Sequence, residues 1–507
     1  MSDEKPKNLV VVLLDSLNRH MLEAYGGREF ATPNLAAFAR EALRFTKHHA
    51  GSLPCMPARH DILVGALDFP WRPWGSIEIW EDNIARDLRQ AGVTTMLASD
   101  HPHLFETGGE NYHTDFDAWE YARGHESDPW RTTADPTWVG TPALPAARGA
   151  FHHAYDNSRT YFRTEEDFPG PKTMSAAAQW IRTEAPAHDR FFLFVDEFDP
   201  HEPFDTPLPY AGLYNDDWDG PLAIWPPYVI DATASGQLDA RTARHIRANY
   251  GSKLTMIDHW FGRLMEAIDQ QELGASTAVV VCTDHGHYLG EHDIFGKPAA
   301  PVYSELGRIP LLVRWPGQAP RDVDALTTSV DIHATIADHF GAAVEHPIHG
   351  RSLLPLIEGT ATSVRQLALF GYWGRHVGVT DGTYRYLRGC GEDNFPLSVW
   401  SNRWSTMPIP PFPQIRLPRP DGRATLDRMP GTEVPVIRQP FEPGDQLPFW
   451  AGHIPPSESY LFDTGADPLE TENQVGTRAE IALRDAVATA LREIDAPSDV
   501  LERIGVA

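Results

Sequence analysis

The chain has 507 residues, more than one simple hydrophobic core usually supports, so we expect one large domain that carries a smaller one, or two domains. Lys and Arg number 43 against 70 Asp and Glu, and the resulting net charge of −27 argues against nucleic acids and anionic membrane surfaces as partners. No apolar segment is long enough to span a bilayer and no signal-like region precedes the first predicted strand, so we expect a cytoplasmic protein. Three scattered cysteines, Cys55, Cys282 and Cys390, argue against a disulfide framework and a thiolate zinc site.

The first structural signal is the apolar run 9–14, which predicts a strand buried on both faces of a parallel sheet and ending at Asp15. Thr32 and Pro33 are suited to the N-cap and first position of a helix. Strands are also expected over 93–98, 191–195, 278–282, 311–313 and 367–370, helices over 83–90, 241–269 and 331–340, and long loops with short helices over 112–170. This alternation predicts an α/β fold with a large, mostly parallel sheet sandwiched by helices.

Acidic residues and histidines follow the ends of several predicted strands. Asp15 follows the first strand, His103 comes shortly after the second, and Asp284 and His285 follow the fourth. Ligands bind at the carboxyl ends of strands in open α/β sheets, so we expect these side chains to gather at one edge. Asp15, Asp284, His285 and the side chain of Cys55 are candidate ligands for a hard cation, because oxygen-rich ligation suits calcium, magnesium or manganese better than zinc.

The sequence pattern changes near residue 375. The elements expected beyond it are a hairpin over 377–386 with an Asp-Gly turn, an extended proline-dense loop over 395–456, a strand over 460–463 and a helix over 478–493. The proline-dense span could pack on the larger domain or form a homo-oligomer contact. We therefore expect a catalytic α/β domain over residues 1–375 and a smaller α+β subdomain with an antiparallel sheet over residues 376–507.

Residues 54–59 combine a thiol, two flanking prolines and an arginine. Cys55 precedes the apolar run 62–64, so it can lie in the first turn of a helix, where free backbone N–H groups and the helix dipole favour an anion. That position suits a nucleophile that attacks a negatively charged substrate. The alternative is an inert buried cysteine beside a proline turn, and this motif alone leaves both interpretations open.

Cys55-Met56-Pro57-Ala58-Arg59 resembles the modification motif of formylglycine-dependent sulfatases, which belong to the alkaline-phosphatase-like superfamily. Other segments resemble family motifs and keep the family's order. They are Asp15 after the first strand, the Pro-His-x-Pro-like segment Asp199-Pro200-His201-Glu202-Pro203-Phe204, Asp284-His285-Gly286 ahead of Gly296-Lys297, and a C-terminal signature within 460–476. The resemblance covers nearly the whole chain and implies the superfamily's α/β fold.

The resemblance implies that a formylglycine-generating enzyme oxidises Cys55 to Cα-formylglycine, whose aldehyde hydrates to a diol held on one divalent cation. Calcium is the first expectation for this cation, with manganese and magnesium as alternatives. One hydroxyl then attacks sulfur or phosphorus and expels the alcohol, and deprotonation of the second hydroxyl restores the aldehyde and releases the anion.

The resemblance also implies roles for four other side chains. Arg59, one helical turn after Cys55, holds the diol and screens the metal carboxylates. Lys297 and His201 contact oxygens of the transferring group, and one of them protonates the leaving oxygen. His103 is the expected base when the diol collapses to the aldehyde.

The chain departs from the family pattern in places that bear on its substrate. Ser16 stands where many sulfatases have a second aspartate, and residues 99–103 replace a Gly-Lys-Trp-His segment. Ala58 makes the motif similar to that of phosphonate monoester and phosphodiester hydrolases. We therefore expect hydrolysis of small-molecule sulfate monoesters, with phosphonate monoester or phosphodiester hydrolysis as the alternative and a catalytically silent anion-binding relative as the third reading.

Overall fold

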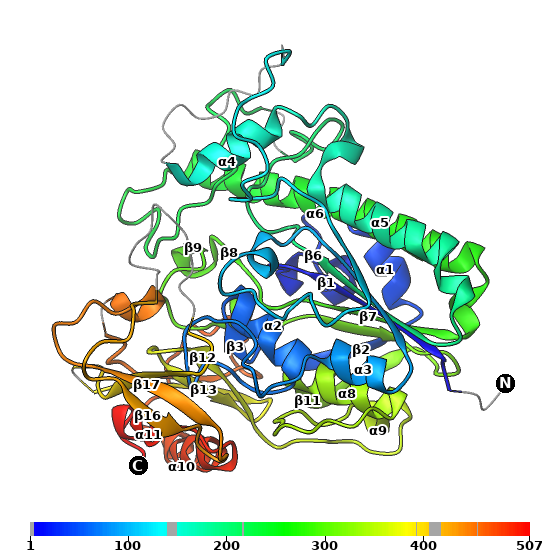
Figure 1. Ribbon diagram of the computed structural model, residues 1–507. Coiled ribbons are helices and arrows are strands. Elements are labelled where there is room, and N and C mark those ends of the chain that lie inside the picture. Colours follow the sequence, from blue (N-terminus) through cyan, green and yellow to red (C-terminus); the bar gives the residue numbers. More distant parts are fainter. Residues whose placement is uncertain (1–4, 139–149, 215–216, 392, 405–416, 454) are drawn as a thin grey trace.

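A computed structural model describes residues 5–138, 150–214, 217–391, 393–404, 417–453 and 455–507. Its centre is an eight-stranded sheet with the order β11-β2-β10-β7-β1-β6-β4-β5 (Figure 1). The strands are β1 (Asn8–Leu14), β2 (Leu43–His49), β4 (Thr94–Ser99), β5 (Ala118–Tyr121), β6 (Phe191–Glu197), β7 (Thr277–Cys282), β10 (Leu311–Arg314) and β11 (Arg321–Thr328). β10 runs antiparallel to both of its neighbours, and the other pairs in this sheet are parallel. The predicted large, mostly parallel sheet is confirmed.

Helices cover both faces of this sheet, as Figure 1 shows. One face packs against α2 (Cys55–Val64), α3 (Ile84–Gln90), α8 (Val330–Phe340) and α9 (Leu354–Ile357), and the other against α1 (Pro33–Ala39), α5 (Pro169–Thr183) and α6 (Ala240–Gln270). β1 serves both faces, because Leu9, Val11 and Leu13 join the first apolar cluster while Val10, Val12 and Leu14 join the second. This two-sided burial explains why the sequence of β1 is apolar throughout. Among the described residues, no helix has the length and apolar character that a membrane span needs.

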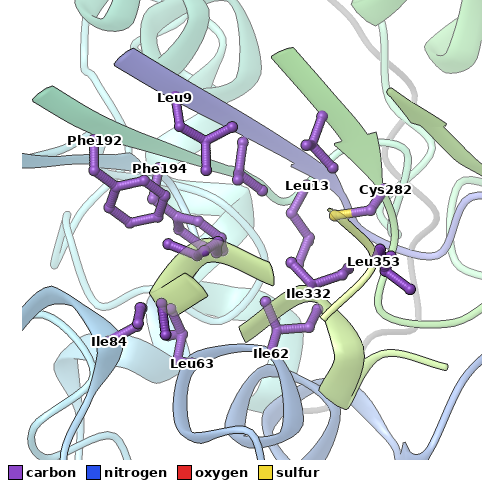
Figure 2. Packing of buried hydrophobic residues seen from close by; sticks show 14 of the residues in the cluster. Leu9, Leu13, Ile62, Leu63, Ile84, Phe192, Phe194, Cys282, Ile332 and Leu353 are labelled. Carbon is purple, nitrogen blue, oxygen red and sulfur yellow. The ribbon is translucent and has the colours of Figure 1, made fainter. Parts of the chain in front are cut away.

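The packing of α2 fixes the position of the cysteine at its first residue. Figure 2 shows Ile62 and Leu63 of α2 beneath Leu13, Phe192 and Phe194 of the sheet. Each of these side chains is at most 1% exposed. Complete burial of such a side chain contributes about 1.5–3 kcal/mol, so α2 is held firmly against the sheet.

A second sheet with the order β18-β14-β13-β12-β3 lies beside the first. Its strands are β3 (Ser52–Leu53), β12 (Ala368–Tyr372), β13 (Val377–Thr380), β14 (Tyr384–Arg388) and β18 (Tyr460–Asp463), and α10 (Arg478–Glu493) and α11 (Ser498–Arg503) pack near it. The strand predicted over 367–370 therefore belongs to this sheet and not to the large one. The two-residue strand β3 joins the sheet next to β12, so the subdomain reaches the segment that leads into Cys55.

Several elements differ from the sequence predictions. The proline-dense span contains a three-stranded antiparallel sheet of β15 (Leu397–Ser401), β16 (Thr425–Arg428) and β17 (Pro435–Phe441), so the prediction of an extended loop is wrong for these segments. Residues 405–416 and 454 of that span lie outside the described residues. β2 and β11 were not predicted, because their mixed polar and apolar residues lack the continuous apolar run of β1. The remaining α-helices and strands are α4 (Ala150–Arg159), β8 (Tyr288–Leu289), β9 (Phe295–Gly296) and α7 (Ser304–Gly307).

The N-cap of α1 also differs in detail from its prediction. Thr32 precedes the helix, but its side chain forms no capping hydrogen bond with α1. The Thr32 hydroxyl instead accepts a hydrogen bond from the backbone N–H of Glu23 at 3.1 Å. The hydroxyl therefore ties α1 to the preceding loop.

Candidate active site

Four neighbouring strands bring polar residues to one edge of the large sheet. In the spatial order β7, β1, β6 and β4, they carry Asp284, Asp15, Asp196 and His101 at or just beyond their carboxyl ends. All four strands are parallel, so these ends lie at the same edge. The sheet thus gathers residues that are up to 269 positions apart in sequence.

Cys55 approaches this edge from outside the large sheet. It is the first residue of α2 and comes two residues after β3. Its Sγ lies 3.2 Å from His285 Nε2 and 3.7 Å from Lys297 Nζ. Burial and the nearby Asp15 raise the pKa of the Cys55 thiol well above its ordinary value, although Lys297 opposes the shift. The unmodified cysteine is therefore a neutral thiol, which is a poor nucleophile.

The predicted metal ligands converge on one point. Asp15, Cys55, Asp284 and His285 each offer a donor atom, and these four atoms lie within 4.8 Å of one another. His285 Nδ1 donates a hydrogen bond to the carbonyl of Gly286 at 2.8 Å, which leaves the lone pair of Nε2 facing the cluster. Burial lowers the pKa of His285 to about 3, so the ring is neutral, as a metal ligand must be. This donor set fits a divalent cation with oxygen and nitrogen ligands.

Arg59 is a fully buried cation that joins the carboxylates around this cluster. Its Nη1 lies 2.8 Å from Asp15 Oδ2 and 2.9 Å from Asp284 Oδ2. Its Nη2 lies 2.7 Å from Asp196 Oδ1 on the neighbouring strand. Burial disfavours the guanidinium charge, but Asp196, Asp15 and Asp284 outweigh burial and raise the pKa of Arg59 well above its ordinary value. Arg59 therefore neutralises part of the negative charge of Asp15 and Asp284, two of the candidate metal ligands.

Loss of Arg59 is expected to destabilise the fold. An Arg59→Met substitution would leave buried carboxylates without a counter-charge, and breaking such a buried ion pair costs about 3–5 kcal/mol. We expect a fall of that size in the free energy of unfolding, measured by urea denaturation. The control is Arg44→Met, because the Arg44–Asp322 pair has side chains 37% and 54% exposed and should contribute no more than about 1 kcal/mol. Equal losses in the two variants would contradict the role assigned to Arg59.

Lys297 follows β9 and lies against Cys55. Its Nζ donates a hydrogen bond to Ser16 Oγ at 3.1 Å, and the side chain is buried. Burial disfavours the ammonium form, but the carboxylates of Glu202, Asp15 and Asp284 favour it, and the pKa of Lys297 lies above its ordinary value. Lys297 is therefore a protonated amine next to the site where an ester would react. Ser16, which replaces a second aspartate, is one of its partners.

Four histidines surround the ring of Phe198. The ring centroids of His201, His101, His125 and His103 lie 4.2, 4.3, 4.7 and 6.3 Å from the centroid of that ring. Two of them, His103 and His201, are predicted site residues. Both therefore lie against Phe198, just beyond the carboxyl ends of β6 and β4.

His103 is held between two glutamates. Its Nδ1 donates a hydrogen bond to Glu106, and its Nε2 lies 3.3 Å from Glu126 Oε2. Burial disfavours its charge, but the two carboxylates raise the pKa of His103 to about 10. In the free protein His103 is therefore an imidazolium that donates hydrogen bonds.

His201 has the opposite protonation state. Its Nδ1 donates a hydrogen bond to the carbonyl of Glu202 at 2.8 Å. Burial lowers the pKa of His201 to about 4, although the carboxylate of Glu202 opposes the shift. His201 is therefore neutral near pH 7, and its Nε2 carries a lone pair.

Two carboxylates of this region were not predicted as site residues. Asp196 comes directly after the predicted strand 191–195, and its position beyond a buried strand was the available signal. Glu202 lies within the Pro-His-x-Pro-like segment, accepts a hydrogen bond from Tyr228 and lies 3.4 Å from His287 Nε2. The sequence alone could not reveal that Glu202 contacts Tyr228 and His287, because both partners are distant from it in the chain.

His101 is a further residue that the sequence prediction left out of the site. It stands in the segment that replaces Gly-Lys-Trp-His, and its Nε2 lies 3.9 Å from Asp15 Oδ2. Burial lowers the pKa of His101 well below its ordinary value, and Arg59 adds to this effect. His101 is therefore a neutral imidazole next to Asp15, one of the four candidate metal ligands.

The large, mostly parallel α/β sheet with four candidate metal ligands at its carboxyl edge matches an alkaline-phosphatase-like fold. A family model described as sulfatase matches residues 7–342, which is more than half of the chain. The chain therefore belongs to the sulfatase family. Both the predicted family and the prediction of an enzyme of the sulfuric ester hydrolase class are confirmed.

Two curated relatives illustrate the range of the family. The chain is 27% identical over 410 residues to the multifunctional alkaline phosphatase superfamily protein PehA of Trinickia caryophylli, an alignment that covers 71% of this chain and 79% of PehA. It is 24% identical over 413 residues to choline-sulfatase of Rhizobium meliloti (strain 1021), which covers 76% of this chain and 79% of that protein.

Solved structures share the fold over almost the entire chain. The phosphonate monoester hydrolase of Agrobacterium radiobacter has a TM-score of 0.64 at 18% identity, covering 97% of this chain and 95% of that chain. BT4656, solved with its substrate D-glucosamine-2-N,6-O-disulfate, has a TM-score of 0.65 at 16% identity, covering 99% and 98%. These similarities extend through the smaller subdomain as well as the large sheet.

Proposed function

We propose that the protein is a metal-dependent hydrolase of sulfate monoesters whose nucleophile is a formylglycine derived from Cys55. The observation that carries the proposal is the convergence of Cys55 with Asp15, Asp284 and His285 within 4.8 Å. Protonated Lys297 adds a positive charge 3.7 Å from the same sulfur. A neutral buried thiol would serve poorly as a nucleophile, which supports conversion of Cys55 by a formylglycine-generating enzyme.

Asp15, Asp284, His285 and the modified residue 55 would hold one divalent cation, calcium first, with manganese and magnesium as alternatives. When bound, such a cation supplies positive charge that activates the nucleophile and stabilises the negative charge of the transition state. Residue 55, as the hydrated aldehyde, would attack the sulfur atom through one hydroxyl oxygen, whose proton would pass to the nearby carboxylate of Asp284. The bond between sulfur and the alcohol oxygen would then break. The second hydroxyl then loses its proton, the bond between carbon and the sulfate oxygen breaks, and the aldehyde returns as sulfate leaves.

The surrounding protonation states assign the proton transfers. Lys297 is protonated beside residue 55, so it is suited to stabilise an oxygen of the ester and to protonate the departing alcohol. His201 is neutral and can instead accept a hydrogen bond. His103 carries a proton between Glu106 and Glu126, so it can act as the base for collapse of the hydrate only after giving that proton up.

Hydrolysis of phosphonate monoesters or phosphodiesters is the second candidate function. Ala58 in the Cys-x-Pro-Ala-Arg motif favours it, as does Ser16 in place of a second aspartate. The 27% identity to PehA, which is named as multifunctional, also supports activity on more than one ester. Both candidate reactions use the same nucleophile, so they differ in the ester and not in the site.

The mass of the peptide that contains residue 55 tests the first step of the proposal. We expect the peptide from protein co-expressed with a formylglycine-generating enzyme to have the mass of the aldehyde, and the peptides with Cys282 and Cys390 to keep the mass of the thiol. Modification of all three cysteines, or of none under these conditions, would contradict the proposal.

The same preparation then decides the substrate class. We expect a higher kcat/KM for an aryl sulfate than for the matched phenylphosphonate ester. A preference for the phosphonate by several orders of magnitude would replace the leading function by the second. No hydrolysis of either ester by protein that contains the aldehyde would favour a catalytically silent relative.

A further inference from the structure

One buried tyrosine of this protein differs from the others. Six tyrosines are buried among the residues that the structure describes: Tyr112, Tyr155, Tyr250, Tyr288, Tyr372 and Tyr386. Five of them use their hydroxyl in a hydrogen bond within the protein. The Tyr372 hydroxyl is buried and has no hydrogen-bond partner among the described residues. A buried hydroxyl without a partner costs about 1–3 kcal/mol, so its presence requires an explanation.

The fold places Tyr372 beside the nucleophile segment. Tyr372 is the last residue of β12, and in the parallel ladder with β3 it lies opposite Leu53. Leu53 is two residues before Cys55, and paired strands lie about 4.8 Å apart. Tyr372 therefore lies beside the segment that leads into Cys55, although the two residues are distant in sequence.

Trp450 links the ring of Tyr372 to the backbone of Lys297. The Tyr372 ring stacks on Trp450 with a centroid distance of 5.5 Å and an interplanar angle of 20°. The indole Nε1 of Trp450 donates a hydrogen bond to the backbone carbonyl of Lys297 at 2.8 Å. Burial raises the pKa of the Tyr372 phenol, and the Lys297 ammonium opposes that rise, so the two groups lie close enough for their charges to interact.

We propose that the Tyr372 hydroxyl donates a hydrogen bond to an oxygen of the tetrahedral anion, sulfate or phosphonate, that is bound beside Lys297 and residue 55. The inference rests on the proposed function for the identity of that anion. It assigns a substrate-binding residue to the second sheet, whereas the four candidate metal ligands come from the large sheet and α2. The ester oxygens of such a substrate are hydrogen-bond acceptors, which matches the free donor of Tyr372. Binding of substrate would thus satisfy the unpaired hydroxyl.

A Tyr372→Phe variant tests the proposal, because it removes the hydroxyl and no hydrogen bond among the described residues. Its melting temperature should be equal to or higher than that of the wild type, because the variant no longer buries an unpaired hydroxyl. A hydrogen bond to a charged group contributes about 1.5–3 kcal/mol, so kcat/KM for the preferred ester should fall about 10- to 100-fold. The dissociation constant of inorganic phosphate, measured by calorimetry, should rise by a similar factor.

Tyr288→Phe is the matched control. Tyr288 belongs to the same apolar cluster, and its hydroxyl donates to the Pro301 carbonyl at 2.9 Å and accepts from the Tyr303 N–H at 2.8 Å. We expect this variant to have a lower melting temperature but an unchanged phosphate affinity and kcat/KM.

The phosphate measurement separates this inference from the proposed function. If the wild type hydrolyses neither ester but binds phosphate, and Tyr372→Phe weakens that binding, the proposed function fails and the anion-binding role of Tyr372 stands. If the wild type binds no phosphate, or if Tyr372→Phe binds phosphate and turns over ester within twofold of the wild type, the inference on Tyr372 is wrong.

Discussion

Replacing Cys55 by alanine is expected to lower ester hydrolysis by about 10⁴-fold or more, because a covalent mechanism cannot proceed without its nucleophile. Cys55 is 5% exposed and alanine is smaller, so the substitution should leave the fold intact. The rate of hydrolysis should be measured with the preferred ester, on preparations whose folding is checked by circular dichroism. A Cys55→Ser variant refines the test, because a serine ester lacks the second hydroxyl that releases the anion. We expect at most one turnover per molecule of the serine variant.

The other two cysteines provide the control for this result. Cys390 is buried, and its thiol donates a hydrogen bond to the carbonyl of Gly391 at 2.9 Å. It does not belong to the group of candidate metal ligands. Cys282 is the last residue of β7, and its side chain packs in the apolar core with Leu13 (Figure 2). A Cys390→Ala variant should keep its activity within about twofold, since a single hydrogen bond away from the site contributes mainly to stability. Full activity of Cys55→Ala would refute the nucleophile and, with it, the proposed mechanism.

Removal of the divalent cation is expected to have the second largest effect. Dialysis against a chelator should lower hydrolysis by about 10³-fold or more, and addition of calcium, manganese or magnesium should restore it. Asp284→Asn should cause a comparable loss that added metal does not repair, because a carboxylate ligand is replaced by a weaker neutral one. Metal content per protein molecule, measured by elemental analysis, should fall in parallel with activity.

Asp196→Asn is the matched control for Asp284→Asn. Both aspartates form ion pairs with Arg59, but Asp284 belongs to the group of four donor atoms and Asp196 does not. We expect Asp196→Asn to keep its bound metal and to lose no more than about tenfold in activity, the cost of weakening one interaction that orients Arg59. Equal loss of metal from both variants would show that the ion pairs with Arg59, and not direct ligation, hold the cation.

Much of this site could be predicted from the sequence because its signals are local. The continuous apolar run of β1 predicted a buried parallel strand, and Asp15 at its end predicted a functional carboxylate. Cys55 and Arg59 lie within one turn of the same helix, and Asp284 and His285 are neighbours. Each of these groups is therefore specified by a short segment whose conformation its own residues largely determine.

Other features depended on tertiary structure because they join segments that are distant in the chain. The order β7-β1-β6-β4 decided that Asp196 meets Arg59, and no periodicity in the sequence encodes that order. Contacts with Glu106 and Glu126 keep His103 protonated, whereas the family resemblance implies a base at this position. The pairing of β12 with β3 placed Tyr372 beside the nucleophile segment.

The amino-acid sequence by itself thus determined the type of fold and the family motif around Cys55, and it supplied the candidate ligand residues. Tertiary structure alone decided the protonation state of His103 and His201, the ion pairs of Arg59 and the position of Tyr372. The physical reason is that a strand or helical turn follows from neighbouring residues, whereas burial and charge at a site depend on every segment that packs around it.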